Sequence, residues 1–320
     1  MTEKKRKISI LGTGNVGASV AYAALIQGLA SEILLVDINK EKAKGEALDL
    51  SQCAACVPSC KVWCGEYEDV AGSDIVVVTF GVGRKPGQSR LDLAKINIGI
   101  LESVMPNVAK IAPDALYVIV SNPVDLLTYT TIKCTGLPVN QVVGTGAMLD
   151  TNRLTQAIAE YCGVDVSNVG SYVLGEHGDS CMVPWSLCTV AGLPVKEYIT
   201  KVMKVDPAKV DEELDAIYKG MVAAGSQVIK AKGATYYAIA VTVCALIKAL
   251  VSDTNTILPV STMLNGEYGG NNICTGVPCV VGATGIKSIV DLPLAEDEAK
   301  LLKEKIDTLT GNYDALELRK

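Results

Sequence analysis

KISILGTGNVG, residues 7–17, joins a short apolar run to a glycine-rich turn. The apolar run is typical of a buried strand, and residues 15–29 have the pattern of a helix. Gly12, Gly14 and Gly17 between them have the G-x-G-x-x-G spacing, which allows a tight turn, close approach of a diphosphate and close helix packing. The stretch therefore predicts a dinucleotide-binding βαβ unit.

An acidic residue at the end of the next apolar run supports this prediction. Asp37 ends a predicted strand at 33–37, 20 residues after Gly17. A carboxylate at this place binds the ribose hydroxyls of NAD and repels the 2′-phosphate of NADP. The alternative is a strand-end Asp beside spare turn glycines. We expect NAD as the cofactor, bound by Gly12, Gly14, Asn15, Val16, Gly17 and Asp37.

Strand and helix patterns alternate through the first half of the chain. Strands are predicted at 7–11, 33–37, 74–80, 117–121 and 141–144, and helices at 15–29, 40–50, 91–111 and 124–134. Such alternation gives parallel pairing through right-handed crossovers. We expect an α/β fold whose N-terminal part is a doubly wound parallel sheet of the Rossmann type.

The alternation ends near residue 148. Helices are predicted at 149–161, at 207–251 with breaks at glycines, and at 296–309, and strands at 257–264 and 273–281 around an Asn-Gly turn. We therefore expect an NAD-binding Rossmann domain at 1–147 and a substrate-binding, catalytic α+β domain at 148–320. Because no Pro- or Ser-rich linker separates them, the two domains should pack tightly.

The composition is that of a soluble globular protein. Hydrophobic residues make up 49% of the chain and charged residues 20%, and the formal net charge is −6. A negative chain without a long apolar run makes nucleic acid and membrane poor candidates as partners. Eleven cysteines without a secretory signal favour reduced thiols and a cytoplasmic location.

Four of the cysteines, Cys53, Cys56, Cys60 and Cys64, fall within twelve residues. A metal is not expected there, because the single histidine has a better assignment elsewhere. Reversible oxidation that tunes activity is the other hypothesis that this spacing raises.

The chain has one histidine, His177, in the glycine-flanked stretch LGEHGDS at 174–180. Asp150 and Arg153 are three residues apart at the start of one predicted helix, so both side chains project from the same face. The two could form a plain ion pair within the helix. The alternative is an Asp that orients an imidazole beside an Arg that binds a carboxylate.

Five segments together resemble the lactate/malate dehydrogenase family. They are GTGNVG at 12–17, RKPGQSR at 84–90, SNPVD at 121–125, LDTNR at 149–153 and GEHGDS at 175–180, in the family's order and spacing over essentially the whole chain. The resemblance implies hydride transfer between a nicotinamide and a small 2-hydroxy or 2-oxo acid.

The resemblance also implies roles for individual residues. His177 would be the catalytic acid/base, with Asp150 holding its ring. Arg153 would bind the C1 carboxylate of the substrate, and Arg90 would polarise the reacting carbonyl as a catalytic and binding residue. Asn122 would bond near the nicotinamide and the substrate oxygen, and its bond to the following proline is predicted to be cis.

One position bears on the substrate. Six residues before Arg90, lactate dehydrogenases commonly carry Gln and malate dehydrogenases Arg, and this chain has Arg84. A second cation can pair with the distal carboxylate of oxaloacetate, whereas pyruvate would leave it unpaired. We therefore expect a malate dehydrogenase of the lactate-dehydrogenase-like type, acting in the tricarboxylic acid cycle. Thr235 and residues 143–146 are closer to the lactate branch, so L-lactate dehydrogenase is the alternative.

Two rivals come from other classes. An NAD-dependent glycoside hydrolase would need a divalent metal held by Cys and His, and a non-catalytic NAD sensor would need only the phosphate loop. We expect neither, and no metal. The expected partners are a small dicarboxylate, malate or oxaloacetate, and further copies of the chain in a homodimer or homotetramer.

Overall fold

The computed structural model describes residues 6–83, 89–178 and 180–319. Six parallel strands form one half of its main sheet, in the order β3-β2-β1-β4-β5-β6. The order reverses between β1 and β4, which is the point where doubly wound sheets bind dinucleotides. The six are β1 (Lys7–Leu11), β2 (Glu32–Val36), β3 (Lys61–Cys64), β4 (Ile75–Val78), β5 (Leu116–Ile119) and β6 (Val142–Gly144).

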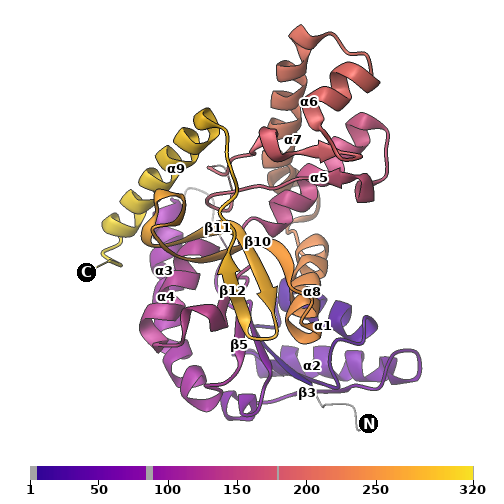
Figure 1. The fold of residues 1–320 in the computed structure, drawn as a ribbon. Coiled ribbons are helices and arrows are strands. Elements are labelled where there is room, and N and C mark those ends of the chain that lie inside the picture. Colours follow the sequence, from indigo (N-terminus) through magenta and orange to yellow (C-terminus); the bar gives the residue numbers. More distant parts are fainter. Residues whose placement is uncertain (1–5, 84–88, 179, 320) are drawn as a thin grey trace.

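Helices cover both faces of this sheet (Figure 1). On one side α3 and α4 pack against each other, and on the other α1 packs against α8 from the second half of the chain. Because both faces are covered, strands such as β4 are buried at every position. The helices are α1 (Asn15–Ile26), α2 (Lys40–Ser51), α3 (Arg90–Ile111), α4 (Val124–Thr135) and α8 (Tyr237–Ser252).

The second half adds three strands to the same sheet. β10 (Thr256–Asn265) runs antiparallel to β6, with Ser261 opposite Gly144, and is followed in the sheet by β11 (Asn271–Gly282) and β12 (Gly285–Ile289). A Cβ atom at Gly144 would lie 2.7 Å from that of Ser261 and 2.3 Å from Oγ1 of Thr128. The glycine therefore permits the close contact that brings Ser261 against the parallel strands.

The rest of the second half forms a lobe above the sheet, where Figure 1 shows α5, α6 and α7. It has its own apolar core, built mainly from α5, α7 and the residues around β8. Its elements are α5 (Met148–Cys162), β7 (Val169–Gly170), β8 (Thr189–Val190), β9 (Leu193–Pro194), α6 (Val195–Glu197) and α7 (Val210–Lys232), and α9 (Glu296–Ala315) closes the chain. Short helical turns lie at Gln52–Ala55, Tyr67–Val70, Val139–Gln141, Val166–Asn168, Trp185–Leu187, Tyr198–Val202, Pro207–Lys209 and Glu267–Gly269.

The segment that carries His177 is packed into both cores. Val173 and Cys181 belong to the core of the lobe, whereas Leu174 and Met182 belong to the core around the main sheet. Each end of the short segment between them is therefore anchored in both cores, and the segment lies where they meet.

The predicted doubly wound sheet is confirmed. β3 and β12, and the strands β7, β8 and β9 of the lobe, were not predicted, because each is short and lacks the dense apolar run of the other strands. Of the breaks predicted at glycines in 207–251, the one at Gly233 is confirmed: this residue, with φ +85°, separates α7 from α8, whereas Gly220 and Gly225 lie within α7. None of the helices in the described ranges has the length and apolarity that a bilayer span needs.

Candidate active site

The glycine-rich turn after β1 is shaped for an anion. Gly12 has φ +99°, and a Cβ atom on Gly17 would lie 1.9 Å from the main-chain oxygen of Gly12. Gly14 is different, because a Cβ atom there would meet nothing within 4 Å. Gly14 begins α1 without a side-chain cap, and the first turn has no acidic residue. This helix end thus has neither a capping side chain nor a carboxylate in its first turn, which fits the binding of a diphosphate.

Asp37 lies directly after β2, beside this turn. Its Oδ2 accepts hydrogen bonds from the Thr13 main chain at 2.5 Å and the Thr13 hydroxyl at 3.0 Å, and its Oδ1 accepts one from Asn39 N–H at 2.8 Å. Burial opposes the charge, but these hydrogen bonds outweigh it and hold the pKa of Asp37 below its usual value. The carboxylate is thus ionised and fixed where the ribose of NAD would lie.

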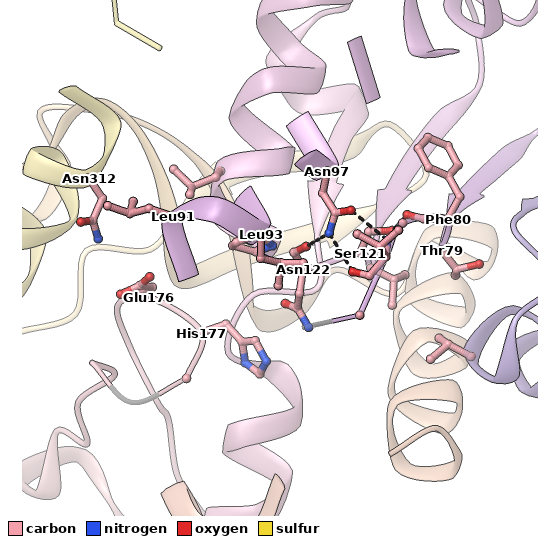
Figure 2. Close-up of a pocket in the computed structure, with 18 of the residues that line it drawn as sticks. Thr79, Phe80, Leu91, Leu93, Asn97, Ser121, Asn122, Glu176, His177 and Asn312 are labelled. Carbon is pink, nitrogen blue, oxygen red and sulfur yellow. Dashed lines mark hydrogen bonds between the residues drawn. The ribbon is translucent and has the colours of Figure 1, made fainter. Parts of the chain in front are cut away.

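A cavity of about 740 Å³ begins at this turn and ends at the histidine. Val16 lines one part, Phe80 and Asn122 line the middle, and Glu176 and His177 line the part nearest the lobe. Figure 2 shows the side chains of Asn122 and His177 entering this same cavity. A bound dinucleotide and a small acid would therefore meet beside His177.

The structure brings three of the predicted site residues together, His177, Asp150 and Arg153. His177 Nδ1 lies 2.6 Å from Asp150 Oδ2, and Arg153 donates to Asp150 Oδ1 at 3.0 Å. The side chain of His177 is 24% exposed, so its ring keeps access to the cavity. Because Asp150 occupies Nδ1, Nε2 is the nitrogen left for a ligand.

Charges around His177 favour its protonated form. Burial lowers the pKa of the imidazole, but the charge and hydrogen bond of Asp150, with a smaller effect of Asp125, raise it above its usual value. Arg153 opposes this effect. The raised pKa favours the protonated imidazole, whose free Nε2 can donate a proton toward the cavity.

The main chain of Asn122, which lines the cavity, is held by a hydrogen bond from α3. Asn97 of α3 donates to its main-chain oxygen at 2.7 Å and accepts from Val82 N–H at 2.9 Å (Figure 2). The Asn122–Pro123 peptide bond is cis. Arg90 begins α3, but its side chain lies outside the described part of the chain, as does all of Arg84. Their predicted roles stay predictions.

Sequence reasoning missed two residues on the other side of His177. Asp125 accepts the main-chain N–H of His177 at 2.9 Å, and Ser261 donates to Asp125 at 2.5 Å. Asp125 stands within the SNPVD segment, but nothing in the sequence gave it a role. Ser261 is 136 residues away, and no pattern signals it.

The cysteine cluster gives no sign of a metal centre. Within the described ranges, no group of three His, Cys, Asp or Glu side chains could hold an ion. Burial, with the charge of Glu32, raises the pKa of Cys60 to about 11, so that thiol is a poor nucleophile at neutral pH.

A doubly wound sheet with an anion-binding turn, an acid for the ribose and a carboxylate-held histidine at one cavity defines an NAD-dependent dehydrogenase of 2-hydroxy acids. Two family descriptions match nearly the whole chain. They are the NAD-binding domain of lactate/malate dehydrogenase at residues 6–144 and the alpha/beta C-terminal domain at 147–317. The chain belongs to the lactate/malate dehydrogenase family, and its cofactor is NAD.

Individual relatives cover the chain end to end. L-lactate dehydrogenase 1 of Clostridium acetobutylicum is 45% identical over 98% of this chain and 99% of its own. L-lactate dehydrogenase of Thermoanaerobacter pseudethanolicus is 40% identical over the same shares. The crystal structure of minor L-lactate dehydrogenase from Enterococcus mundtii, with ligands bound, superposes with a TM-score of 0.92 at 41% identity, over 97% of this chain and 98% of that one.

These relatives overturn the expectation of a malate dehydrogenase acting in the tricarboxylic acid cycle with a dicarboxylate partner. Proteins 40–45% identical over the full chain are named L-lactate dehydrogenase. The wrong prediction depended on the charge of Arg84 alone, whereas the relatives match along the whole chain. Thr235 and residues 143–146, which are closer to the lactate branch, agree with the relatives.

Proposed function

We propose that this protein is an L-lactate dehydrogenase, which interconverts pyruvate and L-lactate with NAD. The observation that carries the proposal is the hydrogen-bonded set of His177, Asp150 and Arg153 at a cavity that continues to the NAD-binding turn. That set fits an acid/base beside a binding group for one carboxylate. The names of the full-length relatives support pyruvate and lactate as the pair.

The proton is transferred by His177. Bound NAD supplies the hydride chemistry. In the direction of reduction, His177 Nε2 gives its proton to the substrate oxygen as the carbonyl becomes a hydroxyl, and in oxidation it takes that proton back. Asp150 holds Nδ1, which orients the ring and stabilises the imidazolium.

The remaining residues orient the substrate. Arg153 presents a planar guanidinium that can bind both oxygens of the C1 carboxylate, while its bond to Asp150 fixes its direction. Asn122 supplies an amide near the reacting oxygen, and Arg90 supplies a cation that polarises the carbonyl. Residues 143–146 and Thr235, which resemble the lactate branch of the family, support the same substrate pair.

The test compares pyruvate with oxaloacetate in NADH oxidation, with wild type and His177→Asn. We expect a higher kcat/KM with pyruvate, and a loss of about 10²- to 10⁴-fold in His177→Asn, with NADH affinity by fluorescence preserved. A preference for oxaloacetate would reject the substrate. Turnover unaffected by His177→Asn would reject the mechanism. NADH binding without turnover of either acid would favour the NAD sensor.

Exposed apolar side chains on two neighbouring helices support the predicted dimer or tetramer. Tyr22 and Ile26 of α1, and Tyr237 and Val241 of α8, are large apolar side chains exposed on two helices that pack together. Such a concentration is typical of a surface covered by another subunit. The mass in solution by light scattering would test this association.

A further inference from the structure

Asp125 is a buried carboxylic acid that the mechanism above does not use. It lies in the first turn of α4 and is 2% exposed. Its Oδ2 accepts the main-chain N–H of His177 at 2.9 Å, and its Oδ1 accepts the hydroxyl of Ser261 at 2.5 Å. Both carboxyl oxygens are therefore committed, one of them to the backbone of the catalytic histidine.

The place of Asp125 is fixed from three other elements. Ser261 comes from β10, while the Tyr313 hydroxyl of α9 donates to the main-chain oxygen of Asp125 at 3.1 Å. The same hydroxyl bonds the main chain of Cys274 in β11. Asp125 thus joins the main sheet and α9 to the segment that carries His177.

An ionised carboxylic acid is energetically unfavourable at this buried position. Among the described residues no Lys or Arg forms an ion pair with Asp125. Burial raises the pKa of Asp125 to about 7, opposed by the bonds from Ser261 and His177 N–H and reinforced by the charge of Glu176. Asparagine has the same size and would avoid this cost, so a structural tether alone does not explain a carboxylic acid here.

We propose that Asp125 is a positioning residue for proton transfer, which with Ser261 fixes the His177 main chain opposite Asp150 and favours the imidazolium by its charge. The proposal rests on the proposed acid/base role of His177. The two carboxylates act through different atoms, because Asp150 binds the ring and Asp125 binds the backbone. Asp125 fixes the position of the His177 main chain, and Asp150 fixes the orientation of its ring. Together they limit the positions that Nε2 can take.

The other groups that face His177 are defined. Asp150 and Arg153 approach from α5, and Glu176 stands next to it in the chain. Glu176 is bonded to the hydroxyl of Ser180, which holds its charge away from the imidazole ring. Asp125 and Asp150 are thus the two carboxylates that raise the pKa of His177, and replacing one at a time separates them.

The experiment uses the single histidine. Because His177 is the only one in the chain, imidazole NMR signals of tag-free protein report on this residue without assignment. We expect Asp125→Asn to move the midpoint of the His177 titration to lower pH, since the ionised form of Asp125, which its pKa of about 7 populates at and above neutral pH, is lost. Asp74→Asn is the matched control, because Asp74 also accepts a distant main-chain N–H, that of Lys7, but away from the site. If the His177 titration midpoint of Asp125→Asn equals that of wild type, the proposed electrostatic effect of Asp125 on His177 is wrong.

Kinetics test the positioning part. Asp125→Asn should lower kcat/KM for pyruvate by about 10- to 100-fold and move its alkaline limb to lower pH, while Asp74→Asn does neither. Ser261→Ala should also lower kcat/KM. Its control is Ser73→Ala, which changes a buried serine far from the site and should leave kcat/KM unchanged. If Asp125→Asn does not fold, Ser261→Ala decides, and an unchanged kcat/KM in that variant overturns the proposal. Wild type without pyruvate turnover would reject the proposed function instead, while the NMR titration would still test the effect of Asp125.

Discussion

Asp150 and Asp125 lie on two sides of one histidine and are about equally hidden, at 4% and 2% exposed. Their surroundings differ. Asp150 meets the guanidinium of Arg153 and the imidazole ring, whereas Asp125 meets only neutral donors, the hydroxyl of Ser261 and a main-chain N–H. The pKa of Asp125 is raised to about 7 by burial. The comparison teaches that two neutral donors do not offset the effect of burial on the pKa of Asp125, whereas the guanidinium and the imidazole give Asp150 cationic partners.

The largest difference should come from replacing Asp150. Asp150→Asn removes both the charge opposite the imidazolium and the acceptor that fixes the Nδ1 proton. We expect kcat/KM for pyruvate to fall by roughly 10³-fold, against 10- to 100-fold for Asp125→Asn. Steady-state rates of both variants, at one pH and with saturating NADH, make the comparison. Equal losses would mean that the two carboxylates contribute alike and would remove the distinction between ring and backbone contacts.

The second test replaces Arg153, the guanidinium that pairs with Asp150 and has no counterpart at Asp125. Arg153→Lys keeps the charge but loses the planar pair of donors, so the substrate carboxylate can no longer be bound by two parallel bonds. We expect KM for pyruvate to rise by about 10- to 100-fold, with a smaller change in kcat. Arg319→Lys is the control, because Arg319 pairs with Asp314 at the end of α9. An unchanged KM would place substrate binding elsewhere.

The third test concerns stability and pH. The pKa of Asp125 is about 7 in the folded state against 3.8 as its ordinary value, so the folded protein holds the extra proton between those limits. Stability due to this group is therefore present at low pH and is lost as pH rises from about 4 to about 7, by at most about 4 kcal/mol.

The raised pKa of His177 acts in the same direction at the upper end of this range. Melting temperatures should thus show wild type losing stability relative to Asp125→Asn as the pH rises from 4 to 7. Asp74→Asn should show no such divergence from wild type. Parallel curves for Asp125→Asn throughout would mean that burial does not raise the pKa of Asp125.

Local features of the site were readable in advance. The turn at 12–17 would bind a diphosphate through its main chain, and the glycine spacing that such a turn needs can be recognised in the sequence. Asp150 and Arg153 are three apart on one helix, so their contact follows from helix geometry. The contact of His177 with Asp150, by contrast, spans 27 residues and was indicated only by the family resemblance.

Other features could not be read. β10 to β12 extend the parallel sheet because β10 pairs with β6, a contact between residues 117 positions apart at Ser261 and Gly144. No period or turn signal encodes such a pairing. Asn97 likewise reaches Asn122 and Val82 from a helix, and in the sequence it is one more polar residue of an amphipathic pattern.

The sequence by itself determined the doubly wound sheet, the glycine-rich turn with Asp37, and, through the resemblance of five segments, the family and its reaction class. The sheet, the turn and the pairing of Asp150 with Arg153 depend on local spacing, which backbone geometry converts directly into shape. Only the tertiary structure decided that Asp125 and Ser261 stand behind His177 and that both halves share one sheet. Such contacts join residues far apart in the chain, and they arise because apolar surfaces of separate elements are buried together, a process that leaves no local pattern in the sequence.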